Sequence, residues 1–134
     1  MRARGQALVE LAIAIPILLV LALGVVGTGR AIYTRVALDA VVREGARAVA
    51  TAADPCDASI GVSRARETAA GYGLDLSRLQ VSVGGGCARG DLRSVAVSYT
   101  VRLQDLAVTP FLRLPGEITM SARAVHMVEQ YRSR

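Results

Sequence analysis

The feature that most constrains the fold is an uninterrupted apolar run near the amino terminus. Nineteen residues without a charged side chain extend from Leu11 to Gly29. At a rise of about 1.5 Å per residue, a helix of this length matches the hydrocarbon thickness of a bilayer. The run therefore predicts a transmembrane helix over about residues 8–29. Pro16 lies inside it and predicts a kink, because proline removes one backbone hydrogen bond of the helix.

An acidic residue, Glu10, opens this run. A carboxylate within a membrane helix costs roughly 2.5–3.5 kcal/mol on insertion scales, so such a residue needs a purpose. One interpretation is a specific partner for the charge, and the alternative is that Glu10 sits at the level of the lipid head groups. Ahead of it, Arg2 and Arg4 form a short basic leader that ends at Gly5.

A cleavable secretory signal peptide is the main alternative for the amino-terminal segment. Such a peptide has a shorter apolar region and ends in a small-x-small cleavage site. Here the apolar run is longer and continues without a break into an amphipathic pattern. We therefore expect the segment to be an anchor that stays with the chain.

Beyond the apolar run, the pattern changes to that of an amphipathic helix. One face carries a charged residue at every fourth position, and the other face is apolar. The charged residues are Arg35, Asp39, Arg43 and Arg47, and the apolar ones are Leu38, Val41, Val42, Ala46 and Val49. We expect Asp39 to pair with Arg43, and Glu44 with Arg47, along the helix. Both patterns together predict one continuous rod.

The rod ends at the Asp-Pro pair of residues 54–55, because the residue before a proline is restrained from helical geometry. A second, shorter helix is expected from about Ser59 to Tyr72. The candidate caps are Asp57 or Ser59 at its start and Gly71 or Gly73 at its end.

Three later segments alternate between apolar and polar residues and predict strands. They cover residues 79–83, 95–103 and 118–128, and a proline-bounded connection over 108–116 precedes the last one. The outer face of the last strand is expected to carry Thr119, Ser121 and Arg123. A short helix followed by a three-stranded antiparallel sheet gives a small α+β head on a helical stalk.

The chain has two cysteines, Cys56 and Cys87, both beyond the apolar run. In an oxidising compartment a disulfide between them would stabilise the small head by about 3–4 kcal/mol in the chain-entropy model. Two free thiols are an alternative. A zinc site is short of ligands, because His126 is the only histidine. The disulfide is the favoured interpretation.

Charge alone does not fix the orientation of the membrane segment. Arg2 and Arg4 favour a cytoplasmic amino terminus, whereas Arg30, Arg35 and Arg43 follow the run and favour the reverse. The cysteine pair and the leader both require the head to lie outside the cytoplasm. We therefore expect a single-pass membrane protein with a cytoplasmic amino terminus and an extracytoplasmic head.

The predicted organisation has three parts. Residues 1–5 form the leader, and residues 6–52 form the continuous helix. Within that helix, about 8–29 is transmembrane and about 30–52 is the amphipathic extension. Residues 53–134 form the disulfide-stapled head.

The sequence holds no constellation of residues for catalysis, and none that would bind a metal or a cofactor. His126 stands alone, and Asp54 and Asp57 are expected to act in a turn and a helix cap rather than as an acid–base pair. Tyr33, just beyond the apolar run, is expected to be an interfacial anchor. The formal net charge of +5 leaves lipid head groups or nucleic acid open as anionic partners, although solvated or locally paired arginines are the simpler interpretation.

Several stretches of this sequence resemble the TadE-like family of minor pilins (pseudopilins) of tight-adherence, or Tad/Flp, pili. They are Gly5-Gln-Ala-Leu-Val-Glu10, the run around Pro16, Gly29-Arg30, and Ala37-Leu38-Asp39 through Arg43-Glu44-Gly45-Ala46-Arg47. The Thr109-Pro110-Phe111-Leu112 turn and the Ile118-Thr-Met-Ser-Ala122 strand are weaker matches. The resemblance covers about residues 5–50.

The resemblance implies that a prepilin peptidase cuts between Gly5 and Gln6. Glu10 would then be the fifth residue of the mature chain, and in pilin-like proteins this carboxylate pairs with the terminal amine of a neighbour. Such a pair neutralises two charges in an apolar environment. The implied partners are other pilin and pseudopilin subunits through the amino-terminal helix, the peptidase, the inner-membrane assembly platform and membrane lipid.

Two departures point to a minor subunit rather than the shaft protein. Major Flp pilins commonly have an aromatic residue directly after the glutamate, whereas this chain has Leu11. The predicted head is also far larger than that of a major Flp pilin. The main prediction is a non-catalytic minor pilin that helps to initiate or assemble an adhesive filament. The alternatives are a ligand-binding domain (an adhesin or a DNA-capturing subunit) on an uncleaved anchor, and an anchored envelope enzyme, which the missing constellation argues against.

Overall fold

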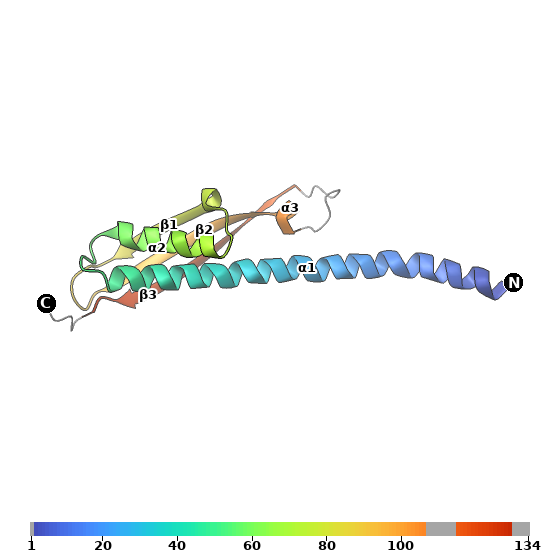
Figure 1. The fold of residues 1–134 in the computed structure, drawn as a ribbon, viewed down its shortest axis with the longest axis horizontal. Coiled ribbons are helices and arrows are strands. Elements are labelled where there is room, and N and C mark those ends of the chain that lie inside the picture. Colours follow the sequence, from blue (N-terminus) through green and yellow to red (C-terminus); the bar gives the residue numbers. More distant parts are fainter. Residues whose placement is uncertain (1, 107–114, 130–134) are drawn as a thin grey trace.

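The computed structural model describes residues 2–106 and 115–129, with side chains from residue 6 onward. One long helix runs the length of the molecule, and a small head lies along its carboxy-terminal half (Figure 1). The elements are α1 (Arg2–Ala50), α2 (Ala58–Gly71), the 3₁₀ turn η1 (Leu76–Arg78), β1 (Leu79–Gly85), β2 (Leu92–Arg102), α3 (Leu103–Leu106) and β3 (Glu117–Met127). This arrangement confirms the predicted α+β class. Most of the connection predicted over 108–116, including the Thr109–Leu112 turn, lies outside the described residues.

Helix α1 has 49 residues and runs without interruption through Pro16. At about 1.5 Å per residue its length is about 74 Å, which is long for a compact domain. Its amino-terminal half projects beyond the head and meets no other element (Figure 1). The helix therefore has two environments, one bare and one packed.

The three strands form an antiparallel sheet in the order β1-β2-β3. In the middle of the sheet Val97 pairs with Val81 on one side and with Ala122 on the other. Alternate residues of β2 are buried against the helices, as the sequence pattern predicted. They are Val95, Val97, Tyr99 and Val101. Thr119, Ser121 and Arg123 of β3 are exposed, which agrees with the predicted outer face.

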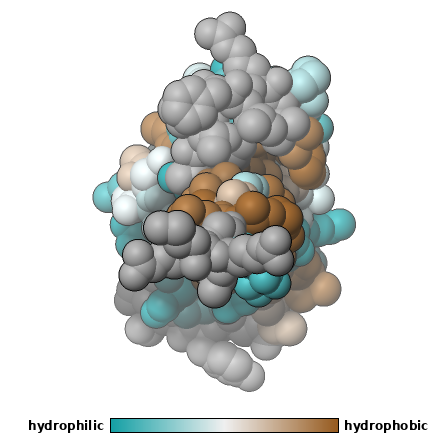
Figure 2. Space-filling view, turned by 90° about the vertical axis from the view of Figure 1, so that its right-hand side faces the viewer, coloured by the Kyte–Doolittle hydropathy of each residue, from teal (hydrophilic) through white to brown (hydrophobic). Residues whose placement is uncertain are grey.

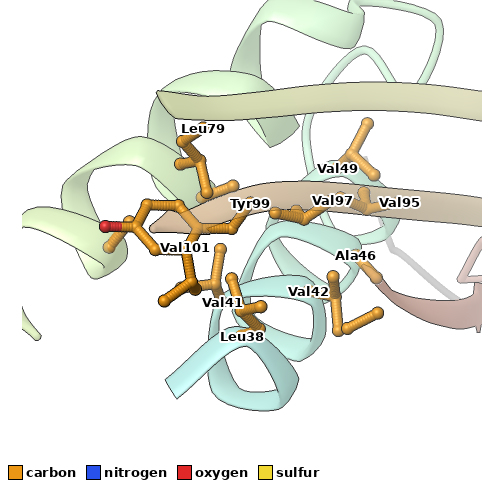
Figure 3. Packing of buried hydrophobic residues seen from close by; sticks show 13 residues of the cluster. Leu38, Val41, Val42, Ala46, Val49, Leu79, Val95, Val97, Tyr99 and Val101 are labelled. Atoms are coloured by element: carbon orange, nitrogen blue, oxygen red, sulfur yellow. The ribbon is translucent and has the colours of Figure 1, made fainter. Parts of the chain in front are cut away.

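The core lies between the packed half of α1 and the sheet (Figure 3). The apolar face predicted for α1 is fully buried, with Leu38, Val41, Ala46 and Val49 each 0 % exposed and Val42 2 % exposed. Val41, Val42 and Ala46 face β2 in Figure 3. Because a helix returns to the same face every three to four residues, this one pattern attaches the head to the rod.

Helix α2 packs on α1 through small residues. Gly45 of α1 faces Gly61 and Ala65 of α2, both within 3.2 Å of where a Cβ on Gly45 would lie. The side chain of Asp57 caps α2 by accepting a hydrogen bond from Ser59 N at 2.9 Å. The chain leaves the helix through Gly73, whose φ of +72° favours glycine. Both caps were among the residues expected from the sequence.

Two strand boundaries differ from the prediction by more than one residue. β1 continues to Gly85 and β2 begins at Leu92, because the backbone pairing extends into the glycine-rich segment. Glycines have no side chain to alternate, so the sequence pattern could not reveal this extension. Gly85 has φ +96°, and a Cβ there would lie 2.2 Å from the Leu92 carbonyl oxygen, so the close approach requires glycine.

The two ion pairs predicted along α1 are wrong. Asp39 Oδ2 lies 4.0 Å from Nε of Arg35, one turn earlier, instead of pairing with Arg43. Glu44 lies 3.9 Å from Arg64 of α2 instead of pairing with Arg47. The packing of α2 on α1 brings Arg64 within reach of Glu44, which a pattern confined to one helix could not predict.

Candidate functional site

The bare half of α1 is the most distinctive surface of the molecule. Large apolar side chains from Leu8 to Val26 are exposed along it, up to 73 % for Val25. Viewed from the amino-terminal end of α1, hydrophobic residues gather near the centre of the molecule (Figure 2). Among the described residues, α1 is the one helix long and apolar enough to cross a membrane, and its most apolar 18-residue stretch is entirely unburied. It is therefore a candidate membrane span.

The residues predicted as the cleavage and assembly site lie in the first turns of α1. Gly5 and Gln6 both have helical backbone. Glu10 follows one turn after Gln6, so both residues lie on the same face of the helix. The Glu10 carboxylate is exposed and contacts no described side chain through a hydrogen bond or ion pair. A negatively charged group that could pair with a cation is thus exposed on an otherwise apolar surface.

Pro16 lies inside α1, in the bare half. Its ring nitrogen cannot donate to the carbonyl of Ala12, so one backbone acceptor loses its helical partner. In a membrane such an acceptor is satisfied by neighbouring helices, water or local distortion. The kink at Pro16 stays a prediction.

The head reaches α1 at the end of the apolar run, which the sequence did not predict. A Cβ on Gly27 would lie 3.2 Å from the carbonyl oxygen of Leu106 in α3. One turn later, Arg30 Nη1 donates to the Asp105 carbonyl oxygen at 3.0 Å. The end of the predicted span is therefore covered by the head on one side. The glycines at this end were the only sequence signal, since small residues permit close approach.

Charged side chains of the head hold α3 in this position. Arg78 Nη1 lies 2.5 Å from Asp105 Oδ2, and Arg78 Nε lies 3.2 Å from Asp75 Oδ2. The hydrogen bond to Asp105 raises the pKa of Arg78 above its ordinary value. Hydrogen bonds from Ser77 lower the pKa of Asp75. With its carboxylate bound to Arg78, Asp105 offers Arg30 its backbone oxygen alone.

Tyr33, expected to be an interfacial anchor, contacts the end of α2. Its ring lies edge-on to that of Tyr72, with centroids 6.3 Å apart and planes at 65°. The Tyr33 hydroxyl also donates to the Tyr72 carbonyl oxygen at 3.5 Å. Edge-to-face pairs of this kind contribute about 0.5–1.5 kcal/mol beyond their buried area. Tyr33 thus links the rod to the head at the edge of the apolar segment.

At the opposite end of the head, Cys56 and Cys87 form a disulfide with a Cα–Cα distance of 5.1 Å. Arg93 lies beside it and is only 7 % exposed. Its guanidinium donates to the carbonyl oxygens of Gly85 at 2.9 Å and of Cys56 at 3.4 Å, while its Nε has no partner. The burial of this arginine was not predicted, because a charged residue in a strand gives no sign that it is buried.

The acidic residues near the disulfide act locally. Asp54 Oδ1 accepts from Cys56 N at 2.9 Å, and Asp57 caps α2. Hydrogen bonds from the Ser59 side chain and backbone lower the pKa of Asp57. His126 lies on β3 directly opposite Arg93 in the strand register. Within residues 2–106 and 115–129, no three His, Cys, Asp or Glu side chains gather as metal ligands would.

These features define a class of protein, one whose long amino-terminal helix is shaped as an anchor for a small α+β head. Residues 5–47, which include Gly5, Glu10 and Pro16, match the family described as TadE-like protein. The match agrees with the resemblance predicted from the sequence, and it covers 43 of the 134 residues. Proteins of this family are generally non-catalytic structural components that interact with other parts of the pilus. No curated protein and no solved structure matches the chain.

Proposed function

We propose that this chain is a minor pilin of a Tad (Flp) pilus, processed by a prepilin peptidase and used to initiate or assemble an adhesive filament. The observation that carries the proposal is the unpartnered Glu10 carboxylate, which lies on the bare half of α1 one turn beyond Gln6. The family match over residues 5–47 supports it, since that segment contains the leader glycine, Glu10 and the apolar run.

In the proposed pathway the peptidase cuts after Gly5 and leaves Gln6 as the new terminus. The new amine pairs with the Glu10 carboxylate of a neighbouring subunit, so that neither charge stays unpaired among apolar helices. The bare half of α1 crosses the inner membrane before assembly, and the same surface packs on other pilin helices afterwards. The head lies outside the cytoplasm, where an oxidising environment keeps the Cys56–Cys87 bond formed.

The amino-terminal sequence of the protein recovered from its native membrane tests this proposal. The measurement is made in cells with and without the prepilin peptidase, on the wild type and on Gly5→Leu. We expect a start at Gln6 that depends on the peptidase and disappears in Gly5→Leu. The matched control, Gly24→Leu, changes a glycine of the same helix that has no neighbour within 4 Å, and it should still be cut. A start at Met1 in every sample, or a cut beyond Gly29, contradicts the proposal.

A second candidate, a ligand-binding head on an uncleaved anchor, is favoured by one observation. A groove of about 620 Å³ crosses the three strands, and Ser82, Ser98 and Arg123 line it together with Arg35 of α1. Two guanidinium groups and several hydroxyls suit an anionic polymer. Binding to immobilised DNA or envelope polymer across a salt series, with Arg123→Gln as the variant, separates this candidate from the first. Glu10→Ala should leave such binding unchanged but impair filament assembly.

A further inference from the structure

A cavity of about 540 Å³ lies where α1 leaves the apolar run and meets the head. Its walls combine apolar side chains from both parts, among them Val26, Leu74 and Leu106. Polar groups lie at the same cavity, chiefly Arg30 and Tyr33 of α1. Apolar walls with a few convergent polar groups are the usual composition of a small-molecule site.

The position of the cavity along α1 sets its depth in a membrane. The residues of α1 that line it extend from Val26 to Thr34, a rise of about 12 Å. Val26 belongs to the bare apolar surface, and Arg30 is the first charged residue after nineteen uncharged ones. If α1 crosses the bilayer as proposed above, the cavity lies at the level of the lipid head groups, with Val26 at its end nearer the bilayer core.

The residues that line the cavity include one cationic side chain, Arg30, and one acidic side chain, Asp105. Arg30 has no carboxylate partner among the described residues, and its one hydrogen bond goes to the Asp105 carbonyl oxygen. The Asp105 carboxylate is instead paired with Arg78, with 2.5 Å between Arg78 Nη1 and Asp105 Oδ2. Arg30 therefore presents free guanidinium donors to the cavity, in the geometry that binds phosphate.

A buried hydroxyl adds a second polar group. Tyr99 lines the cavity and is 8 % exposed, with its hydroxyl at the edge of the core cluster (Figure 3). The hydroxyl oxygen accepts a hydrogen bond from Asp75 N at 3.3 Å, and no described group accepts its proton. A buried donor without an acceptor is costly, and a polar ligand would satisfy it.

From these contacts we propose that the cavity binds the head group of an anionic glycerophospholipid. The guanidinium of Arg30 binds the phosphate, and the hydroxyls of Tyr33 and Tyr99 contact the glycerol and head-group oxygens. One acyl chain leaves along Val26 and Leu106 into the bilayer. A membrane lipid is the occupant because the apolar wall of the cavity is continuous with the bare surface of α1 that lipid would already cover. The inference rests on the proposed function only in requiring that α1 spans a membrane.

Retention of lipid by the full chain tests the inference. The protein is reconstituted in nanodiscs of phosphatidylcholine with a minor fraction of phosphatidylglycerol. It is then extracted in mild detergent, and native mass spectrometry counts the lipids that stay bound. Two variants alter the cavity: Arg30→Gln removes the charge, and Gly29→Leu fills the space, since no atom lies within 4 Å of a Cβ there. Their matched controls are Arg43→Gln, an exposed arginine of α1 about 20 Å further along, and Gly24→Leu.

We expect one phosphatidylglycerol to stay bound to the wild type and to both controls. Arg30→Gln should retain about tenfold less, the loss expected for one charged hydrogen bond. Gly29→Leu should also retain less, because its side chain occupies the cavity. Equal retention in Arg30→Gln and Arg43→Gln overturns the inference, as does equal retention of both lipids. Displacement by glycerol 3-phosphate as effective as by a short-chain phosphatidylglycerol would show a plain phosphate site and also overturns it. Failure of the chain to enter nanodiscs at all contradicts the membrane anchor itself, so the two failures are distinguishable.

Discussion

Gly45 of α1 and Gly61 of α2 lie opposite each other where the two helices pack. A Cβ on Gly45 would lie 3.1 Å from the Gly61 carbonyl oxygen, and a Cβ on Gly61 would lie 3.4 Å from the Gly45 carbonyl oxygen. Ala65, one turn further along α2, is fully buried on the same face. The helices therefore meet backbone to backbone, and the side chains beside the contact, such as Ala65 at 3.2 Å from a Cβ on Gly45, are short and buried.

Replacement of Gly45 should separate the two helices. Gly45→Val adds three carbon atoms where the nearest neighbours are backbone and the Ala65 side chain, so we expect the free energy of unfolding to fall by about 1–3 kcal/mol. Denaturant unfolding of the full chain in detergent measures the change. Gly71→Val is the matched control, because nothing lies within 4 Å of a Cβ at Gly71. A Gly45→Val chain as stable as the control would mean that the contact is loose.

The disulfide should account for a large share of the stability of the head. The bond closes a loop with a sequence separation of 31, for which the chain-entropy model gives about 3–4 kcal/mol. We expect the double variant Cys56→Ser, Cys87→Ser to lose that amount in denaturant unfolding. The wild type in reductant should fall to the same level, while the double variant should not respond to reductant. Equal stability of both chains without reductant would contradict the bond.

The cap of α2 should make the stability of the head depend on pH. The pKa of Asp57 is below its ordinary value of 3.8, because hydrogen bonds from Ser59 favour the carboxylate. Its stabilising effect is therefore complete above pH 3.8 and is lost as the pH falls through the lowered value. Asp57→Asn keeps a cap that cannot titrate. The wild type should melt at a higher temperature than the variant at pH 7, and this difference should shrink at acid pH. A constant difference between the two pH values would contradict this role.

The charge of Glu10 should matter for assembly and not for insertion. Glu10→Gln keeps the shape of the side chain but removes the charge that a neighbouring amine would need. Breaking a buried ion pair leaves the other charge uncompensated and costs about 3–5 kcal/mol, so incorporation into surface filaments should drop by at least about tenfold. Membrane fractionation should show no loss of the anchored protein. Glu129→Gln, an exposed acid at the far end of the head, is the control. Normal filament incorporation of Glu10→Gln would contradict the proposed pairing.

Periodic patterns in the sequence predicted the parts of the fold that one element determines by itself. Leu38, Val41 and Val49 recur at helical spacing, and all three are fully buried. Val95 and Val97 alternate as strand residues should, and they face the same core. In both cases one face of the element is buried, so apolar residues recur with the period of that element. This pattern can be recognised without knowledge of the partner element.

Contacts between different elements could not be predicted from such periodic patterns. The pairing of Glu44 with Arg64, the approach of Gly27 to Leu106, and the burial of Arg93 all depend on where a distant segment packs. The same holds for the cavity between α1 and the head, whose lining comes from well-separated parts of the chain. The motif around Gly5 and Glu10, by contrast, is contiguous, and it could be recognised from the sequence.

The bare half of α1 has an energetic consequence for any assembly built from it. Lipid tails are as apolar as leucine side chains, so a helix that leaves a bilayer for a bundle of similar helices exchanges one apolar neighbour for another. The hydrophobic effect needs water on one side of such an exchange, and here it contributes almost nothing. The free energy that favours assembly must come from charge pairing, from close packing at small residues such as Gly24, and from external work. A subunit of this shape would therefore return from a filament to the membrane at little hydrophobic cost, once its charge pair is broken.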